Sequence, residues 1–198
     1  MKKKQLEILL ERIESFDHPS LKHEQYSTPA SVAADLLFLA YMHDDLGVVC
    51  DLGCGTGILA VGAALLGAKS IGVDIDPFAL ASAKTNAKKL DAEVEFILGD
   101  VKDLEFKGID TVVMNPPFGA QKSSQGDRPF LKKAMHMAKT IYTINNAGSE
   151  GFIQRFIKPC KVQEIYHIPF RLKRSFEFHR ESCKTINVEL YRITCCNP

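Results

Sequence analysis

The sequence predicts an α/β protein with one doubly wound, mostly parallel sheet of seven strands and a helical extension at its N-terminus. From residue 47 onward, short apolar segments of strand type alternate with segments of helical spacing, which is the pattern of successive βαβ units. The last two apolar segments, 161–168 and 185–194, have no clear helix between them. We therefore expect them to form an antiparallel hairpin at one edge of the sheet.

The N-terminal extension, residues 1–46, is expected to contain two helices. Four apolar residues between positions 6 and 13 recur at helical spacing, and the segment 17–19, Asp-His-Pro, would end this first helix. Thr28 and Pro29 would supply the N-cap and the first-turn proline of the second helix. The inner face of that helix would carry Val32, Ala33, Leu36, Leu37 and Ala40.

The α/β core, residues 47–198, is expected to hold the seven strands and four helices. The predicted strands are 48–51, 70–74, 94–98, 109–114, 140–144, 161–168 and 185–194. The predicted helices are 57–66, 77–90, 128–139 and 149–157, the second of them capped by Asp76. Since there is no internal repeat, low-complexity segment or linker, residues 1–198 are expected to form a single domain.

The composition is that of a globular protein, with 45% apolar and 25% charged residues. No apolar run reaches the roughly 18–20 residues that a membrane-spanning helix needs. Gln5 and Glu7 follow the initial lysines where a signal peptide would have an apolar core, so we expect a cytoplasmic protein. The six cysteines include no Cys-x-x-Cys pair and no Cys/His cluster of zinc spacing, which predicts reduced thiols and no bound metal. Cys50 and Cys54 are interpreted as small packing residues.

A formal net charge of +1 requires any nucleic-acid-binding surface to be local. One candidate is the lysine run 2–4, and the other is the stretch 171–184. The basic residues of the second stretch are Arg171, Lys173, Arg174, Arg180 and Lys184. A solvated loop would account for this composition equally well.

The loop that follows the first core strand predicts a cofactor site. Gly53, Gly55 and Gly57 have no Cβ to keep a ligand from the backbone, and the loop would lie at the carboxyl ends of the strands, where ligands bind in such sheets. Residues 55–60 also fit the dinucleotide fingerprint. However, Asp51 at the start of the loop would repel a pyrophosphate and attract the ammonium and sulfonium groups of S-adenosylmethionine. The sequence therefore favours S-adenosylmethionine.

Two further carboxylates follow the second and third core strands. Asp74 is placed to accept hydrogen bonds from ribose hydroxyls, and Asp100 from the adenine amino group of the cofactor. Their neighbours Ile75 and Val101 are assigned to the same site. Either carboxylate alone could merely cap a helix or a turn, whereas acidic residues at three successive strand ends indicate a cofactor site.

Asn115, Pro116, Pro117 and Phe118 follow the fourth core strand directly and predict a catalytic site. The two prolines restrict φ, so the turn is rigid. The Asn115 side-chain oxygen and the Pro116 carbonyl can each accept a hydrogen bond from one N–H of an exocyclic amino group. These hydrogen bonds would orient the nitrogen and stabilise the positive charge that develops on it. Asn115 would also border the cofactor, and Phe118 would stack on the base. A rigid turn by itself needs neither the asparagine nor the aromatic residue.

In this order, the glycine loop, Asp74, Asp100 and residues 115–118 resemble class I amino-methyltransferases of the Asn/Asp-Pro-Pro-Phe/Tyr type. Glu-Gln-Tyr at 24–26 narrows the resemblance to the family of methyltransferase-like protein five and its archaeal members, over nearly the whole chain. The resemblance implies N6-methylation of an adenosine in small-subunit ribosomal RNA.

The resemblance also implies roles for residues ahead of the core and for one strand. Gln25, Tyr26 and Thr28 would help to enclose the cofactor. In the eukaryotic members of the family a small zinc-binding activator protein pairs with the sheet, and residues 93–98 would be an exposed edge strand available for such pairing. An edge that is simply protected by its glutamates is the alternative.

Other functions are compatible with the catalytic motif. An asparagine followed by two prolines suits any planar amino donor, so a protein glutamine amide or guanine N2 could be the acceptor. Phe118 and the segment 24–26 favour adenine. A third possibility is a non-catalytic RNA-binding module that has kept the fold, although the intact Asn115 and the intact glycine loop speak against it.

Overall fold

The computed structural model describes residues 1–16, 19–20, 24–117, 126–173 and 183–196, and of residues 171–173 and 183–184 it describes the backbone alone. Its helices are α1 (Lys3–Leu10), α2 (Ala30–Met42), α3 (Ile58–Leu65), α4 (Pro77–Lys89), α5 (Arg128–Met137) and α6 (Glu150–Phe156). Its strands are β1 (Val48–Leu52), β2 (Lys69–Asp74), β3 (Val94–Leu98), β4 (Ile109–Met114), β5 (Ala138–Asn146), β6 (Lys161–Lys173) and β7 (Cys183–Thr194).

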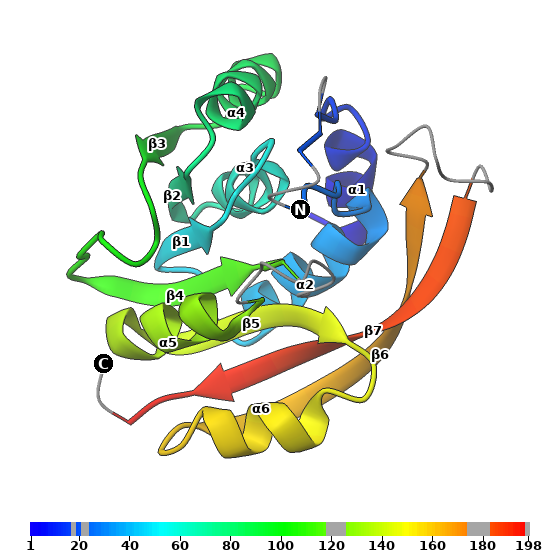
Figure 1. Ribbon diagram of the computed structural model, residues 1–198. Coiled ribbons are helices and arrows are strands. Elements are labelled where there is room, and N and C mark those ends of the chain that lie inside the picture. The colour runs from blue at the N-terminus through cyan, green and yellow to red at the C-terminus, as the bar shows by residue number, and fades with distance from the viewer. Residues whose placement is uncertain (17–18, 21–23, 118–125, 174–182, 197–198) are drawn as a thin grey trace.

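The strands form one seven-stranded sheet in the order β3-β2-β1-β4-β5-β7-β6 (Figure 1). The first five strands are parallel to one another, whereas β7 is antiparallel to both β5 and β6. The doubly wound, mostly parallel sheet predicted from the sequence is therefore confirmed. The predicted edge hairpin is also confirmed, because β6 and β7 pair along almost their whole length and β6 ends the sheet.

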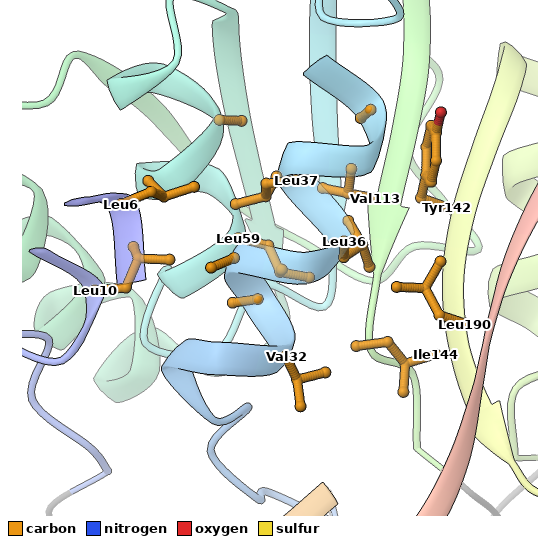
Figure 2. Packing of buried hydrophobic residues seen from close by; sticks show 14 of the residues in the cluster. Leu6, Leu10, Val32, Leu36, Leu37, Leu59, Val113, Tyr142, Ile144 and Leu190 are labelled. Carbon is orange, nitrogen blue, oxygen red and sulfur yellow. The ribbon is translucent and has the colours of Figure 1, made fainter. Parts of the chain in front are cut away.

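Helices cover both faces of the sheet, because the central strands are apolar on both sides. On one face, α1, α2 and α3 share a buried cluster with β4, β5 and β7, and Figure 2 shows the α2 side chains Leu36 and Leu37 within it. On the other face, α5 and α6 pack against the same strands around Leu131 and Ile153. The five residues predicted for the inner face of α2 are all buried. Among the described residues, no helix is long and apolar enough to cross a membrane.

Two predicted helix ends are wrong. The first helix ends at Leu10 rather than near residue 17, because the backbone N–H and C=O of Glu14 bind the side chain of Asn86 and cannot continue a helix. The last residues predicted for α5 belong to β5 instead, since Ala138 already pairs with Ile109 of β4.

The predicted N-cap of α2 is also wrong. Pro29 occupies the N-cap position, and the helix has no side-chain cap. The Thr28 hydroxyl is engaged elsewhere, because it accepts a hydrogen bond from Asn115 Nδ2 at 2.9 Å. By contrast, the cap predicted for α4 is confirmed, since Asp76 accepts a hydrogen bond from the Phe78 backbone N–H at 2.9 Å.

The prediction of reduced thiols is wrong for one pair of cysteines. Cys160 and Cys195 form a disulfide across 35 residues of sequence. Lys161 pairs with Thr194 at the end of the β6–β7 ladder, so the two cysteines just beyond that pair face each other. Their pairing depends on strand register, which sequence spacing does not reveal. Cys50 and Cys54 are free and buried, as expected for packing residues.

Part of the chain between α1 and α2 lies against the glycine loop, and we call its residues 14–16, 19–20 and 24–28 the strap. Asn86 of α4 is buried and holds the strap to this loop: its Oδ1 accepts from Glu14 N at 2.9 Å, and its Nδ2 donates to the backbone oxygens of Glu14 and Thr56. One side chain thereby joins α4, the strap and the glycine loop.

We expect Asn86→Ala to lower the free energy of unfolding by about 2–4 kcal/mol, because three hydrogen bonds are lost and buried backbone groups are left unpaired. Urea titration followed by circular dichroism measures this loss. Thr85→Ala, on the exposed side of the same helix, is the control and should stay within about 0.5 kcal/mol of wild type. Equal stability of the two variants would remove the proposed role of Asn86 in holding the strap.

Candidate active site

A cavity of about 340 Å³ opens at the carboxyl ends of β1, β2, β3 and β4, and the strap forms another side of it. Such strand ends meet at one edge of a parallel sheet, where ligands bind in α/β folds. Among the described residues, four carboxylates line this cavity, from Glu24, Asp51, Asp74 and Asp100, against one basic side chain, from Lys102. The charge of its lining therefore favours a cationic ligand over a phosphate.

The glycine loop lies under two aromatic side chains. Gly53 and Gly55 have φ of 74° and 52°, in the left-handed region that favours glycine. A Cβ at Gly53 would lie 2.9 Å from Phe130 Cε1 of α5, and one at Gly55 would lie 2.8 Å from Phe16 Cζ of the strap. The two glycines thus allow the aromatic rings to close onto the loop, in addition to leaving room for a ligand.

Asp51 is the buried carboxylate at the base of the cavity. Its Oδ2 accepts from the backbone N–H of Ala60 in the first turn of α3 at 3.0 Å, whereas its Oδ1 has no hydrogen-bond partner among the described residues. The pKa of this carboxyl is raised to about 8, chiefly by burial and to a smaller extent by the charge of Asp74, against the opposing effect of the hydrogen bond from Ala60. A cationic group next to Oδ1 would stabilise the ionised form.

The same contact argues against the dinucleotide interpretation. A pyrophosphate binds the free backbone N–H groups at the start of the helix that follows the glycine loop. Here Asp51 already occupies the Ala60 N–H at that position with a carboxylate. A second anion would meet a backbone donor that is already used.

Asp74 and Asp100 line the cavity at the ends of β2 and β3. Both oxygens of Asp74 accept backbone hydrogen bonds, from Gly55 N at 2.7 Å and from Asp76 N at 2.9 Å. Burial raises the pKa of Asp74, although these two hydrogen bonds oppose the rise. Asp100 Oδ1 accepts from Lys102 N at 2.9 Å, so each carboxylate shapes its own loop and still faces the cavity.

The strap brings Gln25, Tyr26 and Thr28 to the cavity wall. The Gln25 side chain is buried and is hydrogen-bonded at both ends of its amide. Its Oε1 accepts from Ser20 N and its Nε2 donates to Asp76 Oδ2, both at 2.7 Å. Tyr26 is half-buried, and burial together with the charge of Glu24 raises the pKa of its hydroxyl. Gln25 therefore acts by holding the strap in place over the cavity.

Asn115 directly follows β4 and is part of the cavity wall. Its Nδ2 donates to Thr28 Oγ1 at 2.9 Å. Its Oδ1 is buried and has no hydrogen-bond partner in the described part of the chain. Because a buried oxygen without a partner costs free energy, this atom is poised to accept a hydrogen bond from a ligand.

The remaining predicted site residues differ in whether they line the cavity. Ile75, Val101 and Pro117 line the cavity, whereas Gly57 and Pro116 are not part of its lining. A Cβ at Gly57 would instead meet Ala83 of α4 at 3.1 Å. Phe118 lies outside the described residues.

Only the strand residues of the predicted basic stretch are described. Arg171 and Lys173 belong to β6, and Lys184 belongs to β7 and pairs with Leu172. Arg174 and Arg180 lie outside the described residues.

The two aromatic residues above the glycine loop were not anticipated from the sequence. Phe16 lies in an irregular segment after α1, and Phe130 lies in a helix whose apolar spacing indicates packing alone. Both line the cavity and are only partly buried. No pattern of neighbouring residues distinguishes them from ordinary core phenylalanines.

Comparison with known proteins agrees with this arrangement. The model of the methyltransferase small domain family matches residues 28–143. An uncharacterized protein of Methanocaldococcus jannaschii is 40% identical, covering 98% of this chain and 94% of its own, and the rRNA N(6)-adenosine-methyltransferase METTL5 of Danio rerio is 33% identical, covering 98% and 99%. The crystal structure of a candidate RNA methyltransferase from Pyrococcus horikoshii superposes with a TM-score of 0.90 at 36% identity, covering 98% of each chain.

We expect the cofactor-free protein to lose stability as the pH rises from about 4 to about 8. The Asp51 carboxyl, with an ordinary pKa of 3.8, holds its proton more tightly when folded, up to a pKa of about 8. The folded state therefore binds more protons than the unfolded state in this window, and the free energy of unfolding falls with rising pH. Asp51→Asn removes the titration and should flatten the fall.

Thermal unfolding of the wild type and Asp51→Asn at pH 5 and pH 8 measures this difference. Asp103→Asn changes a carboxylate on the surface and should keep the wild-type slope. Parallel slopes for wild type and Asp51→Asn would contradict the assignment of the pH dependence to Asp51.

Proposed function

This chain belongs to the methyltransferase small domain family, and from that premise we propose that it transfers a methyl group from S-adenosylmethionine to the exocyclic N6 of adenosine in small-subunit ribosomal RNA. The observation that carries the proposal is the buried Oδ1 of Asn115, a residue of the cavity wall, which has no hydrogen-bond partner among the described residues. The names of the full-length relatives, which include rRNA N(6)-adenosine-methyltransferases from Danio rerio and Drosophila melanogaster, support adenine in ribosomal RNA as the acceptor.

The cavity fits S-adenosylmethionine, which supplies an electrophilic methyl group on a positively charged sulfur. Oδ1 of Asp51, which has no partner in the part of the chain that the structure describes, would receive the ammonium group of the amino-acid part. The left-handed backbone at Gly53 and Gly55 leaves the loop open to close approach. Asp74 would accept hydrogen bonds from the ribose through lone pairs that its two backbone contacts leave available.

The acceptor nitrogen would be held by Asn115 and Pro116. The lone pair of an aromatic amino group is delocalised into the ring, so the nitrogen is a weak nucleophile. Asn115 Oδ1 would accept a hydrogen bond from one N–H of the amino group, and the Pro116 carbonyl would accept one from the other N–H. These two bonds direct the nitrogen lone pair toward the methyl group. Hydrogen bonds to the positive charge that develops would contribute about 1.5–3 kcal/mol each. The chain needs no general base before attack, because the proton becomes acidic only once the nitrogen carries the methyl group.

We propose that the acceptor base leaves its stack to reach the site. We assign Phe118 as the stacking face, which typically contributes about 1–3 kcal/mol per base. The basic residues Arg171, Lys173, Arg174, Arg180 and Lys184 of the edge hairpin are proposed to contact the phosphates of the RNA. A cytoplasmic location is proposed with this substrate.

We expect Asn115→Ala to abolish methyl transfer while the dissociation constant of S-adenosylhomocysteine stays within a few-fold of wild type. Purified ribosomal RNA incubated with labelled S-adenosylmethionine and digested to nucleosides gives the product by mass spectrometry. N6-methyladenosine formed by the wild type supports the proposal. Methylation of N2 of guanine, or of a glutamine side chain in a ribosomal protein supplied in parallel, would replace the proposed acceptor.

We further propose that β3 is the docking edge for a small zinc-binding activator protein. β3 ends the sheet, so one side of its backbone has no strand beside it in the described part of the chain. Three large apolar side chains lie exposed around its carboxyl end: Ile75 at 51%, Phe78 at 82% and Leu98 at 57%. Because Asp74 pairs with Leu98 in the sheet, this apolar surface adjoins the cofactor cavity, and a partner there would support the cofactor loops.

We expect Leu98→Asp to weaken binding of the purified activator at least about tenfold, because a charge would be buried at an apolar contact. Isothermal titration calorimetry measures this affinity. Met42→Asp changes an equally exposed apolar residue on α2 and should bind like wild type. Loss of binding in both variants, or in neither, would place the activator elsewhere.

A further inference from the structure

The geometry points to Thr28 as a positioning residue that sets the amide orientation of Asn115, so that Oδ1 and not Nδ2 faces the acceptor amino group. This inference rests on the proposed transfer of a methyl group to an amino nitrogen. It gives the strap a part in the chemical step as well as in covering the cofactor.

The evidence is one hydrogen bond and one unpaired atom on the same side chain. Asn115 Nδ2 donates a hydrogen bond to Thr28 Oγ1 at 2.9 Å, and Thr28 lies 87 positions earlier in the chain. Asn115 Oδ1, at the other end of the amide, is buried and without a partner among the described residues. Thr28 itself is buried at the cavity wall, with 8% of its surface exposed.

The orientation matters because the two ends of an amide have nearly the same shape and opposite hydrogen-bonding character. Oδ1 accepts hydrogen bonds, whereas Nδ2 only donates them. An acceptor amino group presents N–H bonds, so it binds Oδ1 and is repelled by Nδ2. An Asn115 amide turned by 180° would fill the same space and would fail to hold the nitrogen for attack.

Thr28 is held where it can act on this amide. Gln25, three residues earlier in the strap, is fixed by Ser20 and by Asp76 at the start of α4. Directly after Thr28 the chain enters α2, whose side chains are packed in the core. The Thr28 hydroxyl therefore has a fixed position beside β4, and it accepts from Nδ2 there.

A threonine hydroxyl can also donate, and that arrangement would leave Nδ2 toward the cavity. The two arrangements give opposite expectations for a residue that keeps the shape of threonine without its oxygen. Under the inferred arrangement Thr28→Val removes the acceptor that holds Nδ2, so the amide loses its preferred orientation. Under the other arrangement the substitution would release Oδ1 toward the cavity and raise the rate.

The first experiment compares Thr28→Val with Thr28→Ser. Single-turnover methyl transfer is measured at saturating RNA and S-adenosylmethionine, and the dissociation constant of S-adenosylhomocysteine is measured by calorimetry. We expect Thr28→Val to lose about tenfold to hundredfold in rate, the effect of misaligning one hydrogen bond to a developing charge. The dissociation constant should change less than about threefold, and Thr28→Ser, which keeps the hydroxyl, should recover most of the rate. An unchanged rate at saturation, with only the cofactor affinity weakened, would overturn the inference.

The second experiment repeats the substitution in an Asn115→Asp background. A carboxylate has two equivalent acceptor oxygens, so it has no amide orientation to set. Thr28→Val should then cost less than about threefold, compared with its large cost beside Asn115. An equal cost in the two backgrounds would mean that Thr28 acts on something other than the Asn115 amide.

A third measurement is independent of the substrate and decides the matter if Asn115→Asp transfers no methyl groups. The ¹⁵N side-chain amide signals of Asn115 are identified by their absence in Asn115→Asp, and their hydrogen exchange should be faster in Thr28→Val than in wild type. Unchanged exchange would overturn the inference. If exchange depends on Thr28 but the wild type forms no N6-methyladenosine, the proposed acceptor is wrong and the amide orientation stands.

Discussion

The parallel pairing of β1 with β2 and β4 is the constraint on which the whole site depends. In this register Asp51 of β1 lies between Gly72 of β2 and Val113 of β4, so the ends of the three strands meet at one edge. Asp51, Asp74 and Asn115 follow one another across that edge although they are far apart in the chain. Because both faces of these strands are buried under helices, a shift in register would expose core residues, and the relative positions of the three side chains are held by the packing.

The N-terminal strap completes what the sheet edge begins. It is held by side-chain amides instead of by regular structure: Asn86 binds Glu14 and the glycine loop, and Gln25 binds Ser20 and Asp76. Two buried oxygens, on Asp51 and Asn115, are left without partners in the described residues, and both belong to residues that line the cavity. Each lowers the stability of the cofactor-free protein and is available to a ligand, so local instability and function have the same origin.

The site could be predicted from the sequence where chemistry is concentrated in a few neighbouring residues. Aspartates after consecutive strands and an asparagine before two prolines stand in a fixed order, and a parallel sheet brings such strand ends together whatever its details. Phe16 and Phe130 could not be identified in this way, because they reach the glycine loop from a loop and a helix whose docking angles no local pattern reveals. The hydrogen-bonding of Gln25 was likewise hidden, since its partners belong to separate elements.

The sequence by itself determined the order and type of the elements, the edge hairpin and the residues at the strand ends. Apolar periodicity, glycine at left-handed positions and proline after a strand act over a few residues, so they can be read without the fold. Only the tertiary structure decided which distant side chains meet. The hydrogen bond from Asn115 to Thr28, the disulfide of Cys160 with Cys195 and the contact of Phe16 with Gly55 each depend on strand register or on how the strap packs. Such contacts depend on the exact relative positions of distant segments, and local sequence patterns do not specify those positions.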